Sequence, residues 1–493
     1  MKMFSRMACL ILCPLLAVQM AFGSSILIKG ATVIDGTGRK AYRTDIRIVG
    51  DSVAAIGRLR ARKGEEVIDA RGLALAPGFI DIHNHSEEGL TETGTAPTQI
   101  SQGITTIMVG PDGGSPLPVG PYLSRLDGKV APNVGSFVGH AALRLAVMKN
   151  AYVREATPDE IVKMSALAER AMMEGAFGLS SGLEYDVGFS ASTEELIALS
   201  KAVGKFGGIY MTHMRDEEEG LLDAIREASR IGKEAGVPVQ ISHIKAGNRF
   251  VWGKSTEAVA LIDGFRAAGQ DITADAYPYT AWASTITVLV PSRRFEDREE
   301  VAKSLDKVGG ADKVLITSCE AHPDYEGKNL QQIADDERIS PVDVYIKIVK
   351  DGGAGVVCNS MSVEDVERFY KQPWVMVASD GGIGARHPRG AGTFTKVLGK
   401  FVREDNWFSL EEAVRKMTSA PAQRLGIEDR GVVAKGKKAD LVLFDPEKVK
   451  DRSTFTDPQL ISEGVVTVFV NGIKVWDKGK VTGSRPGRIL RHR

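Results

Sequence analysis

Four histidines in this 493-residue sequence end short apolar runs. His83 and His85 close the run 77–82, and His213 and His243 each end a later one. If the first run is a strand, its side chains alternate between two faces, so His83 and His85 point the same way and can chelate a metal ion. An isolated His-x-His pair is often idle, and a single histidine in an apolar run is often a core residue. The other polar groups and the fold therefore decide between these readings.

A carboxylate accompanies the histidines. Asp380, in Ala378-Ser379-Asp380-Gly381-Gly382, ends another apolar run. An Asp-Gly pair is frequent in turns, but a carboxylate here could also bind a metal and exchange a proton with a substrate. Four of only eight histidines, together with this acid, follow apolar runs. The set predicts a hydrolytic metal centre with Asp380 as its catalytic group.

The elements that must position these side chains alternate between strands and helices. Amphipathic helical stretches separate the apolar runs, and several start with capping signals such as Thr157-Pro158-Asp159-Glu160. Eight such strands predict an α/β fold, a (β/α)8 TIM-like barrel whose chemistry lies at the carboxyl ends of its strands. The predicted strands are 75–85, 104–110, 134–139, 176–182, 208–214, 238–245, 271–278 and 374–380.

The two flanks of the chain alternate in strand fashion instead. This predicts one small β-sandwich domain built from both termini, with strands at 26–34, 45–57, 66–68, 439–445 and 465–476. The expected domain limits are 24–75 and 426–493 for the sandwich and 76–425 for the barrel, with an insertion at about 285–341.

Residues 1–23 resemble a secretory signal peptide. Lys2 and Arg6 precede an apolar stretch, and Ala21-Phe22-Gly23 has the small-x-small form of a cleavage site. An uncleaved anchor helix is the alternative, but the stretch is short and Pro14 interrupts it. We therefore expect a secreted or periplasmic protein without a stable membrane anchor.

Composition narrows the choice of partner. Lysine plus arginine and aspartate plus glutamate both number 63, and 43% of residues are hydrophobic. Such a balanced chain can bury a large core and offers nothing to a nucleic-acid backbone, so a small molecule is the expected partner. Cys319 and Cys358 remain after signal cleavage and are either buried thiols or one bridge. The oligomeric state stays open.

Several motifs resemble the amidohydrolase superfamily, and within it the D-aminoacylases, which are N-acyl-D-amino-acid deacylases. The superfamily pattern lies in 77–85, the two later histidines, 379–381 and 438–442. The more specific motifs are Gly178-Leu179-Ser180-Ser181-Gly182-Leu183-x-Tyr185, Ile241-Ser242-His243-x-Lys245, Asp275-x-Tyr277-Pro278-Tyr279, His387-Pro388-Arg389 with Gly392-Thr393-Phe394, and Ala420-Pro421-Ala422-x-Arg424-Leu425-Gly426.

The resemblance implies one or two zinc ions. One subsite would use His83, His85 and Asp380, and the other His213 and His243. Where D-aminoacylases usually carry a bridging cysteine, this chain has Asp112, and a carboxylate can also ligate and bridge zinc. Segment 176–182 lacks the lysine that many superfamily members carbamylate to bridge two metals. Glu184 is left outside the metal set.

The same resemblance implies removal of the acyl group from an N-acyl-D-amino acid. It assigns Tyr185, Lys245 and Arg389 to the substrate carboxylate and implies that His140 contacts either the substrate or a residue that ligates the metal. Strand alternation also places Lys245 on the face of His243. One alternative is a cyclic-amide hydrolase of the hydantoinase or dihydroorotase kind, which would prefer the missing lysine. Another is a non-catalytic binding protein with this fold, which should have lost ligands.

Overall fold

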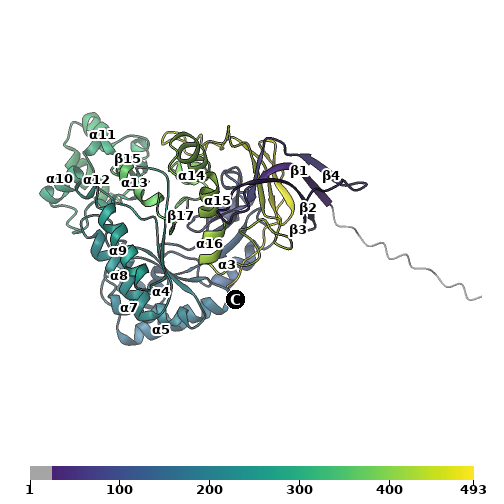
Figure 1. Cartoon of the computed structure of the whole chain (residues 1–493). Helices are drawn as coiled ribbons and strands as arrows, with labels where there is room; N and C mark the ends of the chain where they lie inside the picture. Colours follow the sequence, from purple (N-terminus) through teal and green to yellow (C-terminus); the bar gives the residue numbers. More distant parts are fainter. Residues whose placement is uncertain (1–24, 493) are drawn as a thin grey trace, which may run out of the picture.

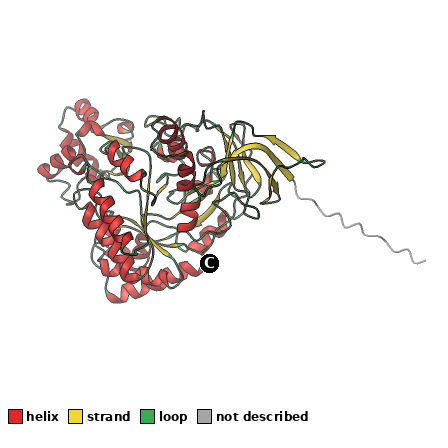
Figure 2. Ribbon diagram, in the orientation of Figure 1, coloured by secondary structure: helices red, strands yellow, loops and turns green. Residues whose placement is uncertain are grey.

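The structure is a computed structural model that describes residues 25–492 (Figure 1). The expected signal peptide at 1–23 lies outside the described residues. The two ends of the chain meet in one strand-rich region, while the middle alternates strands with helices (Figure 2). The fold is therefore mixed α/β. Among residues 25–492, no helix has the length and apolar character that a membrane span requires.

Both ends of the chain contribute to one nine-stranded sheet. Its order is β21-β20-β19-β18-β5-β1-β2-β3, and β4 also pairs with β1. The antiparallel pair of β5 with β18 joins the amino-terminal strands to the carboxy-terminal ones. The strands are β1 Ser25–Val33, β2 Tyr42–Val49, β3 Ser52–Gly57, β4 Glu66–Asp69, β5 Ala74–Pro77, β18 Leu441–Phe444, β19 Val465–Val470, β20 Ile473–Asp477 and β21 Lys480–Val481.

All eight strands expected in the middle of the chain are present, and each contributes at least one segment to two parallel sheets. The first expected strand is divided between β5 and β6, and the third between β8 and β9. One sheet has the order β6-β7-β8 and the other β17-β13-β12-β11-β10-β9. The strands are β6 Phe79–Asp81, β7 Ile104–Val109, β8 Asn133–Ser136, β9 Val138–Gly139, β10 Gly178–Gly182, β11 Ile209–His213, β12 Val239–Ile241, β13 Ile272–Ala276 and β17 Val375–Val377.

The two parallel sheets enclose a common core. One cluster of buried side chains combines Ile80 and Met108 of the first sheet with Met211 and Met376 of the second. A parallel bridge between Asn84 and Gly381 links the segments that follow β6 and β17. These contacts bring the carboxyl ends of β6 and β17 together.

Helices cover the outer side of the parallel strands (Figure 2). Thr157 and Glu160 form the expected capping box at the start of α5, whereas Ser192 and Ser409 cap only through their own side chains. The helices are α1 Gly89–Glu92, α2 Pro97–Ile100, α3 Val119–Leu126, α4 His140–Met148, α5 Pro158–Met173, α6 Asp186–Phe189, α7 Thr193–Gly204, α8 Leu221–Ala235, α9 Ser255–Ala267, α14 Arg389–Lys396, a π-helix at Val397–Glu404, α15 Leu410–Met417 and α16 Ser419–Arg424.

The segment between β13 and β17 forms a separate lobe, at the upper left of Figure 1. It contains an antiparallel sheet in the order β14-β16-β15 and runs from β14 to α13, so it extends beyond the expected 285–341 on both sides. Cys319 and Cys358 are buried free thiols. The elements are β14 Trp282–Thr285, α10 Arg298–Lys307, β15 Val314–Ser318, α11 Leu330–Glu337, α12 Pro341–Lys350, β16 Gly355–Cys358 and α13 Val363–Tyr370.

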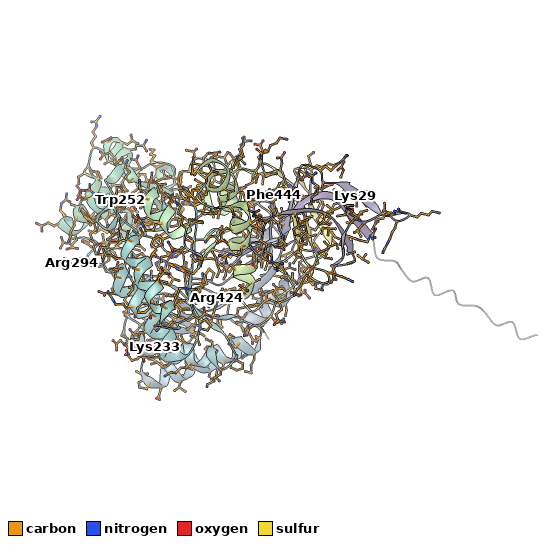
Figure 3. All side chains as sticks on the ribbon, in the orientation of Figure 1. Lys29, Lys233, Trp252, Arg294, Arg424 and Phe444 are labelled. Carbon is orange, nitrogen blue, oxygen red and sulfur yellow. The ribbon has the colours of Figure 1, made fainter. Side chains whose placement is uncertain are left out.

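The terminal sheet shares one buried core with the middle of the chain. Phe444 of β18, labelled in Figure 3, is fully buried in the same hydrophobic cluster as Phe79 and Phe394. Phe79 precedes the first histidine pair, and Phe394 lies in the helix that follows Asp380. The sheet therefore supports two of the segments that carry the expected site.

Candidate metal centre and substrate pocket

All six expected ligands lie at the carboxyl ends of parallel strands. Each either ends a strand or follows it by a few residues, and all are buried except the half-exposed ring of His85. These ends meet because the strands run in parallel, so their last residues emerge on one side of the core. The strands and their residues are β6 with His83 and His85, β7 with Asp112, β11 with His213, β12 with His243 and β17 with Asp380.

Four potential ligand atoms, one each from His83, His85, Asp112 and Asp380, surround one point. His83 Nε2 lies 3.3 Å from His85 Nε2, 3.1 Å from Asp112 Oδ2 and 3.3 Å from Asp380 Oδ1. His85 Nε2 lies 3.4 Å from Asp112 Oδ2 and 3.3 Å from Asp380 Oδ1. A tetrahedral zinc ion, with ligand atoms about 2.0 to 2.2 Å away, holds those atoms about 3.3 to 3.5 Å from one another. The donor set therefore fits a zinc ion in both chemistry and spacing.

A second donor set adjoins the first through Asp112. His243 Nε2 lies 3.4 Å from Asp112 Oδ2 and 2.9 Å from His213 Nδ1. The other carboxylate oxygen, Asp112 Oδ1, is buried and has no hydrogen-bond partner among residues 25–492. Asp112 thus presents one oxygen to both sets and leaves the second without a protein partner, as a bridging ligand would.

In three of the histidine rings, the nitrogen that faces away from the donor sets lies beside a carboxylate. His83 Nδ1 lies 3.2 Å from Asp275 Oδ1, and His213 Nε2 lies 2.8 Å from Glu184 Oε2. His243 Nδ1 lies 3.0 Å from Glu217 Oε1. At His83 and His213 this favours a proton on the nitrogen that faces the carboxylate and leaves the other nitrogen free to ligate, whereas His243 Nδ1 also accepts a hydrogen bond from Lys245 Nζ at 2.7 Å. Three rings are thereby oriented toward the shared centre.

The acids around these rings make the site strongly electronegative. Burial disfavours charge on the rings, yet Asp112 and Asp380 raise the pKa of His85 to about 9. Despite burial and the positive charge of Lys245, the carboxylate of Glu217 helps to raise the pKa of His243 to about 9. Burial alone would raise the pKa of Asp380, but Arg389 and two histidines hold it well below its usual range. The cluster therefore favours positive charge at its centre.

Three of the site residues have left-handed backbone conformations. The φ angles are 52° at Asp112, 33° at His243 and 46° at Asp380. Non-glycine residues seldom adopt this region, although Asp tolerates it better than most. Such conformations occur where the surrounding structure fixes them, often at functional sites.

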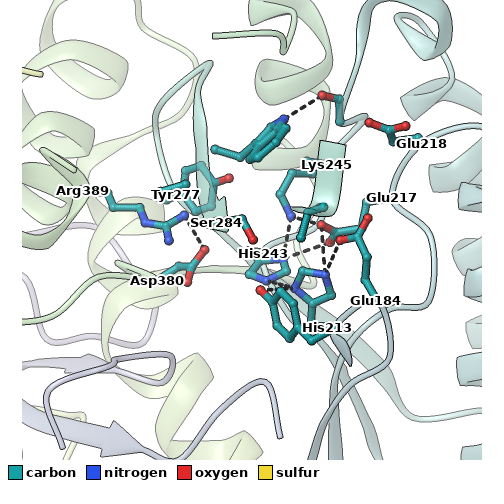
Figure 4. A pocket seen from close by; sticks show the side chains of 15 residues that line it. Glu184, His213, Glu217, Glu218, His243, Lys245, Tyr277, Ser284, Asp380 and Arg389 are labelled. Carbon is teal, nitrogen blue, oxygen red and sulfur yellow. Dashed lines mark hydrogen bonds and ion pairs between the residues drawn. The ribbon is translucent and has the colours of Figure 1, made fainter. Parts of the chain in front are cut away.

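A pocket opens beside the two donor sets (Figure 4). It is lined by the expected carboxylate-binding residues Tyr185, Lys245 and Arg389, together with His213, His243 and Asp380. Both cations already have partners, since Arg389 Nη1 lies 2.6 Å from Asp380 Oδ2 and Lys245 Nζ bonds to Glu217. The Tyr185 hydroxyl lies 3.1 Å from His213 Nδ1. The structure thus brings together nine of the ten residues expected in the site.

Comparison with known proteins gives the same pattern over most of the chain. The model of the amidohydrolase family matches residues 66–475. The chain belongs to the amidohydrolase family. The D-aminoacylase of Alcaligenes xylosoxydans xylosoxydans is 37% identical to this amidohydrolase, over 94% of this chain and 97% of the relative. The N-acyl-D-aspartate deacylase of the same organism is 36% identical, over 95% of each chain.

A solved structure extends the likeness to three dimensions. The N-acyl-D-glutamate deacylase of Bordetella bronchiseptica, complexed with zinc and a phosphonate inhibitor that mimics the reaction tetrahedral intermediate, matches with a TM-score of 0.87. It is 34% identical and covers 95% of this amidohydrolase and 100% of its own chain. The expected membership is therefore confirmed.

The expected substrate contact at His140 needs correction. In this amidohydrolase the His140 ring is fully buried, and its Nε2 lies 2.8 Å from Glu195 Oε1. Arg144 binds the same carboxylate from the other side. His140 is not among the residues that line the pocket. His140 is the first residue of α4, and its side chain contacts Glu195 of α7.

Sequence reasoning gave no role to several residues that contact the site of this amidohydrolase. Asp275 stood in a quoted motif without a function, and Glu217 follows His213 by four residues in a run of three glutamates. Trp282 enters the pocket from the inserted lobe. Asp275 and Glu217 could have been suspected as acids near strand ends, but the path of the lobe has no comparable signal.

Proposed function

We propose that this protein is a zinc-dependent hydrolase that removes the acyl group from N-acyl-D-amino acids, giving a carboxylate and a free D-amino acid. The observation that carries the proposal is the set of four ligand atoms of His83, His85, Asp112 and Asp380 at tetrahedral spacing beside a pocket with Lys245 and Arg389. The relatives named D-aminoacylase and N-acyl-D-aspartate deacylase support the substrate class.

We further propose that the eight parallel strands close into a (β/α)8 barrel within 76–425, with the lobe as its insertion. The common core of the two parallel sheets and the bridge from Asn84 to Gly381 support closure. The terminal segments 24–75 and 426–493 would form a β-sandwich domain. Cleavage after the signal peptide would place the enzyme in the periplasm or outside the cell.

Two overlapping subsites account for one or two zinc ions. The first would use His83, His85 and Asp380, and the second His213 Nδ1 and His243 Nε2. Asp112 would serve both, since its Oδ2 lies within 3.4 Å of ligand nitrogens from each set. A single ion would occupy one of these subsites.

The chemistry divides between the metal and the chain. A bound zinc ion polarises the acyl carbonyl and lowers the pKa of a water molecule toward 7. Asp380 accepts the proton of the attacking water at its carboxylate and returns it to the leaving nitrogen, because an amine anion cannot leave unprotonated. The bond from Arg389 to Asp380 Oδ2 orients the carboxylate so that Oδ1 faces the histidines.

The substrate carboxylate would be read by Tyr185, Lys245 and Arg389. Arg389 stacks over the ring of Tyr277, with its guanidinium carbon 4.8 Å from the ring centre, and this fixes its plane. Its remaining donors can grip a carboxylate with two hydrogen bonds. When both the carboxylate and the scissile carbonyl are held in fixed positions, only one enantiomer at the α-carbon can react.

The carboxylate clamp can be tested by substitution. We expect Arg389→Met and Lys245→Met each to lower kcat/KM on N-acetyl-D-amino acids by about 2 to 4 kcal/mol in transition-state binding, as for a desolvated charge pair. The same substrates as α-amides should lose much less with Lys245→Met; Arg389→Met also removes the partner of Asp380, so it should slow both substrates but the acid more. Steady-state kinetics on matched acids and amides measure the difference, and equal losses on both would show that these residues do not read the carboxylate.

Two alternative functions make different predictions. A cyclic-amide hydrolase would open a hydantoin or dihydroorotate ring, yet β10 carries no lysine to be carbamylated. A non-catalytic binding protein would not need the three carboxylates that orient the histidines. Neither alternative explains why the expected metal ligands lie beside a pocket that contains Lys245 and Arg389.

The decisive experiment combines metal analysis with a chiral assay. We expect purified protein to contain zinc, to lose activity with chelators, and to release amine from N-acetyl-D-amino acids but not from the L-enantiomers. Metal-free protein that still hydrolyses the substrate would refute the metal role. Release from hydantoins but not from linear amides would favour the first alternative.

A further inference from the structure

One glutamate of the pocket wall takes no part in the metal centre or the clamp. Glu218 follows Glu217 in the loop after β11 and lines the pocket with Trp282 of the lobe and Glu184 of the β10 end (Figure 4). Its side chain is 13% exposed. A carboxylate so placed either has a partner in the protein or awaits one from a ligand.

The charges around Glu218 are already paired with one another. Four cations near the pocket each bind a carboxylate other than Glu218: Lys245 with Glu217, Arg389 with Asp380, Arg293 with Asp186, and Lys307 with Glu219. Among residues 25–492, the only cation within 4.0 Å of Glu218 is Lys307, whose Nζ lies 3.9 Å from Glu218 Oε2 but 2.6 Å from Glu219 Oε1.

The second acid of this wall adds to the negative charge. Glu184 lines the same pocket and accepts a hydrogen bond from His213 Nε2. Burial and the nearby Glu184 raise the pKa of Glu218 to about 8. Neither acid has a full countercharge, so a cation bound beside Glu218 would stabilise the ionised form of Glu218 and offset the repulsion from Glu184.

We propose that the pocket selects substrates that carry a positively charged group, and that this group binds against Glu218. The inference rests on the proposed function and specifies its substrate class. The ammonium or guanidinium can come from either side of the scissile amide: from the side chain of a D-lysine or D-arginine residue, or from an amino-terminated acyl group. An anionic side chain in the same place would instead meet the acidic side chains of Glu184 and Glu218.

This preference would set the protein apart from the relatives named for N-acyl-D-aspartate and N-acyl-D-glutamate. A like-charge encounter in a buried site is strongly unfavourable, so discrimination against acidic side chains needs no steric barrier. Trp282 forms the apolar part of the same wall and can cover the methylene stem of a long cationic chain.

The test uses substrate pairs that differ only in charge. N-acetyl-D-lysine is compared with N-acetyl-D-norleucine, and N-acetyl-D-arginine with N-acetyl-D-citrulline, for a side-chain cation. N-(5-aminopentanoyl)-D-methionine is compared with N-pentanoyl-D-methionine for an acyl cation. We expect kcat/KM to be at least about tenfold higher for the charged member in one of the two arms, and the arm that shows it identifies the source.

Variants of Glu218 then assign the effect to this side chain. Glu218→Gln should bring the ratio of charged to neutral substrate close to one, and Glu218→Lys should invert it and favour N-acetyl-D-glutamate. Glu194→Gln is the control, because it removes a carboxylate that is 67% exposed and pairs with Arg230, so the charges around Glu218 do not change and the wild-type ratio should be kept.

The outcomes separate this inference from the proposed function. Cleavage of N-acetyl-D-norleucine with no advantage for any charged substrate, or an unchanged ratio in Glu218→Gln, would overturn the role of Glu218 and leave the deacylase proposal standing. No cleavage of any neutral or charged N-acyl-D-amino acid would instead overturn the proposed function.

Discussion

Replacing Asp380 with asparagine is expected to lower kcat by several orders of magnitude. General acid-base help alone is worth about 10²- to 10⁴-fold, and loss of a metal ligand would add to it. The amide cannot take up the proton of the attacking water. In one orientation, the NH2 group of asparagine would face Arg389, which needs an acceptor. In the other orientation, the NH2 group would face His83 and His85.

The backbone makes this substitution a clean one. Asp380 has φ of 46°, a left-handed conformation that asparagine tolerates as well as aspartate. Asp380→Asn should therefore keep the circular dichroism and thermal melting of the parent. Asp223→Asn serves as a control, because that carboxylate is 86% exposed and lies in the first turn of α8. A fall in kcat of less than tenfold would reject the role of Asp380.

Removing the carboxylate of Asp112 is expected to lower metal content and rate together. Its Oδ2 lies within 3.1 to 3.4 Å of His83, His85 and His243, so Asp112→Ala takes one ligand from both donor sets. Metal per chain is measured by atomic emission and kcat/KM on N-acetyl-D-methionine. Full zinc and full activity in the alanine variant would contradict the assignment.

Two further variants separate ligation from backbone strain. Alanine at φ of 52° is unfavourable by about 1 to 2 kcal/mol, whereas asparagine accepts this conformation. Asp112→Asn keeps the backbone and weakens the ligand, so it should also lose metal. Asp112→Cys restores an anionic ligand and should retain metal despite the strain. If cysteine and alanine lose metal equally, the side chain at this position does not bridge.

Much of the fold could be predicted because its signals are local. Strand alternation, capping residues and short apolar runs located all eight parallel strands and most of the terminal ones, since each depends on neighbours in sequence. The predicted strands 45–57 and 465–476 are each two strands, and β21 was missed. The convergence of the expected ligands could also be predicted, because a parallel α/β arrangement brings residues at strand ends together whatever the loops do. His83, His85, Asp112, His213, His243 and Asp380 indeed converge.

The reason given for one residue was wrong although its position was right. Strand alternation was to place Lys245 on the face of His243, but β12 ends at Ile241 and His243 has φ of 33°. The two side chains meet because the chain turns there, with Lys245 Nζ 2.7 Å from His243 Nδ1. Period-two reasoning fails where a strand stops, and no local signal marked that end.

The sequence by itself determined which residues can ligate a metal and which elements carry them, because both depend on residue type and short-range pattern. Only the tertiary structure decided their partners. Asp275, Glu184 and Glu217 orient the rings across separations of 26 to 192 residues, His140 turns away from the pocket to Glu195, and Trp282 reaches the pocket from the inserted lobe. Such pairings depend on how separate strands and loops pack, and the spacing of residues along the chain does not specify them.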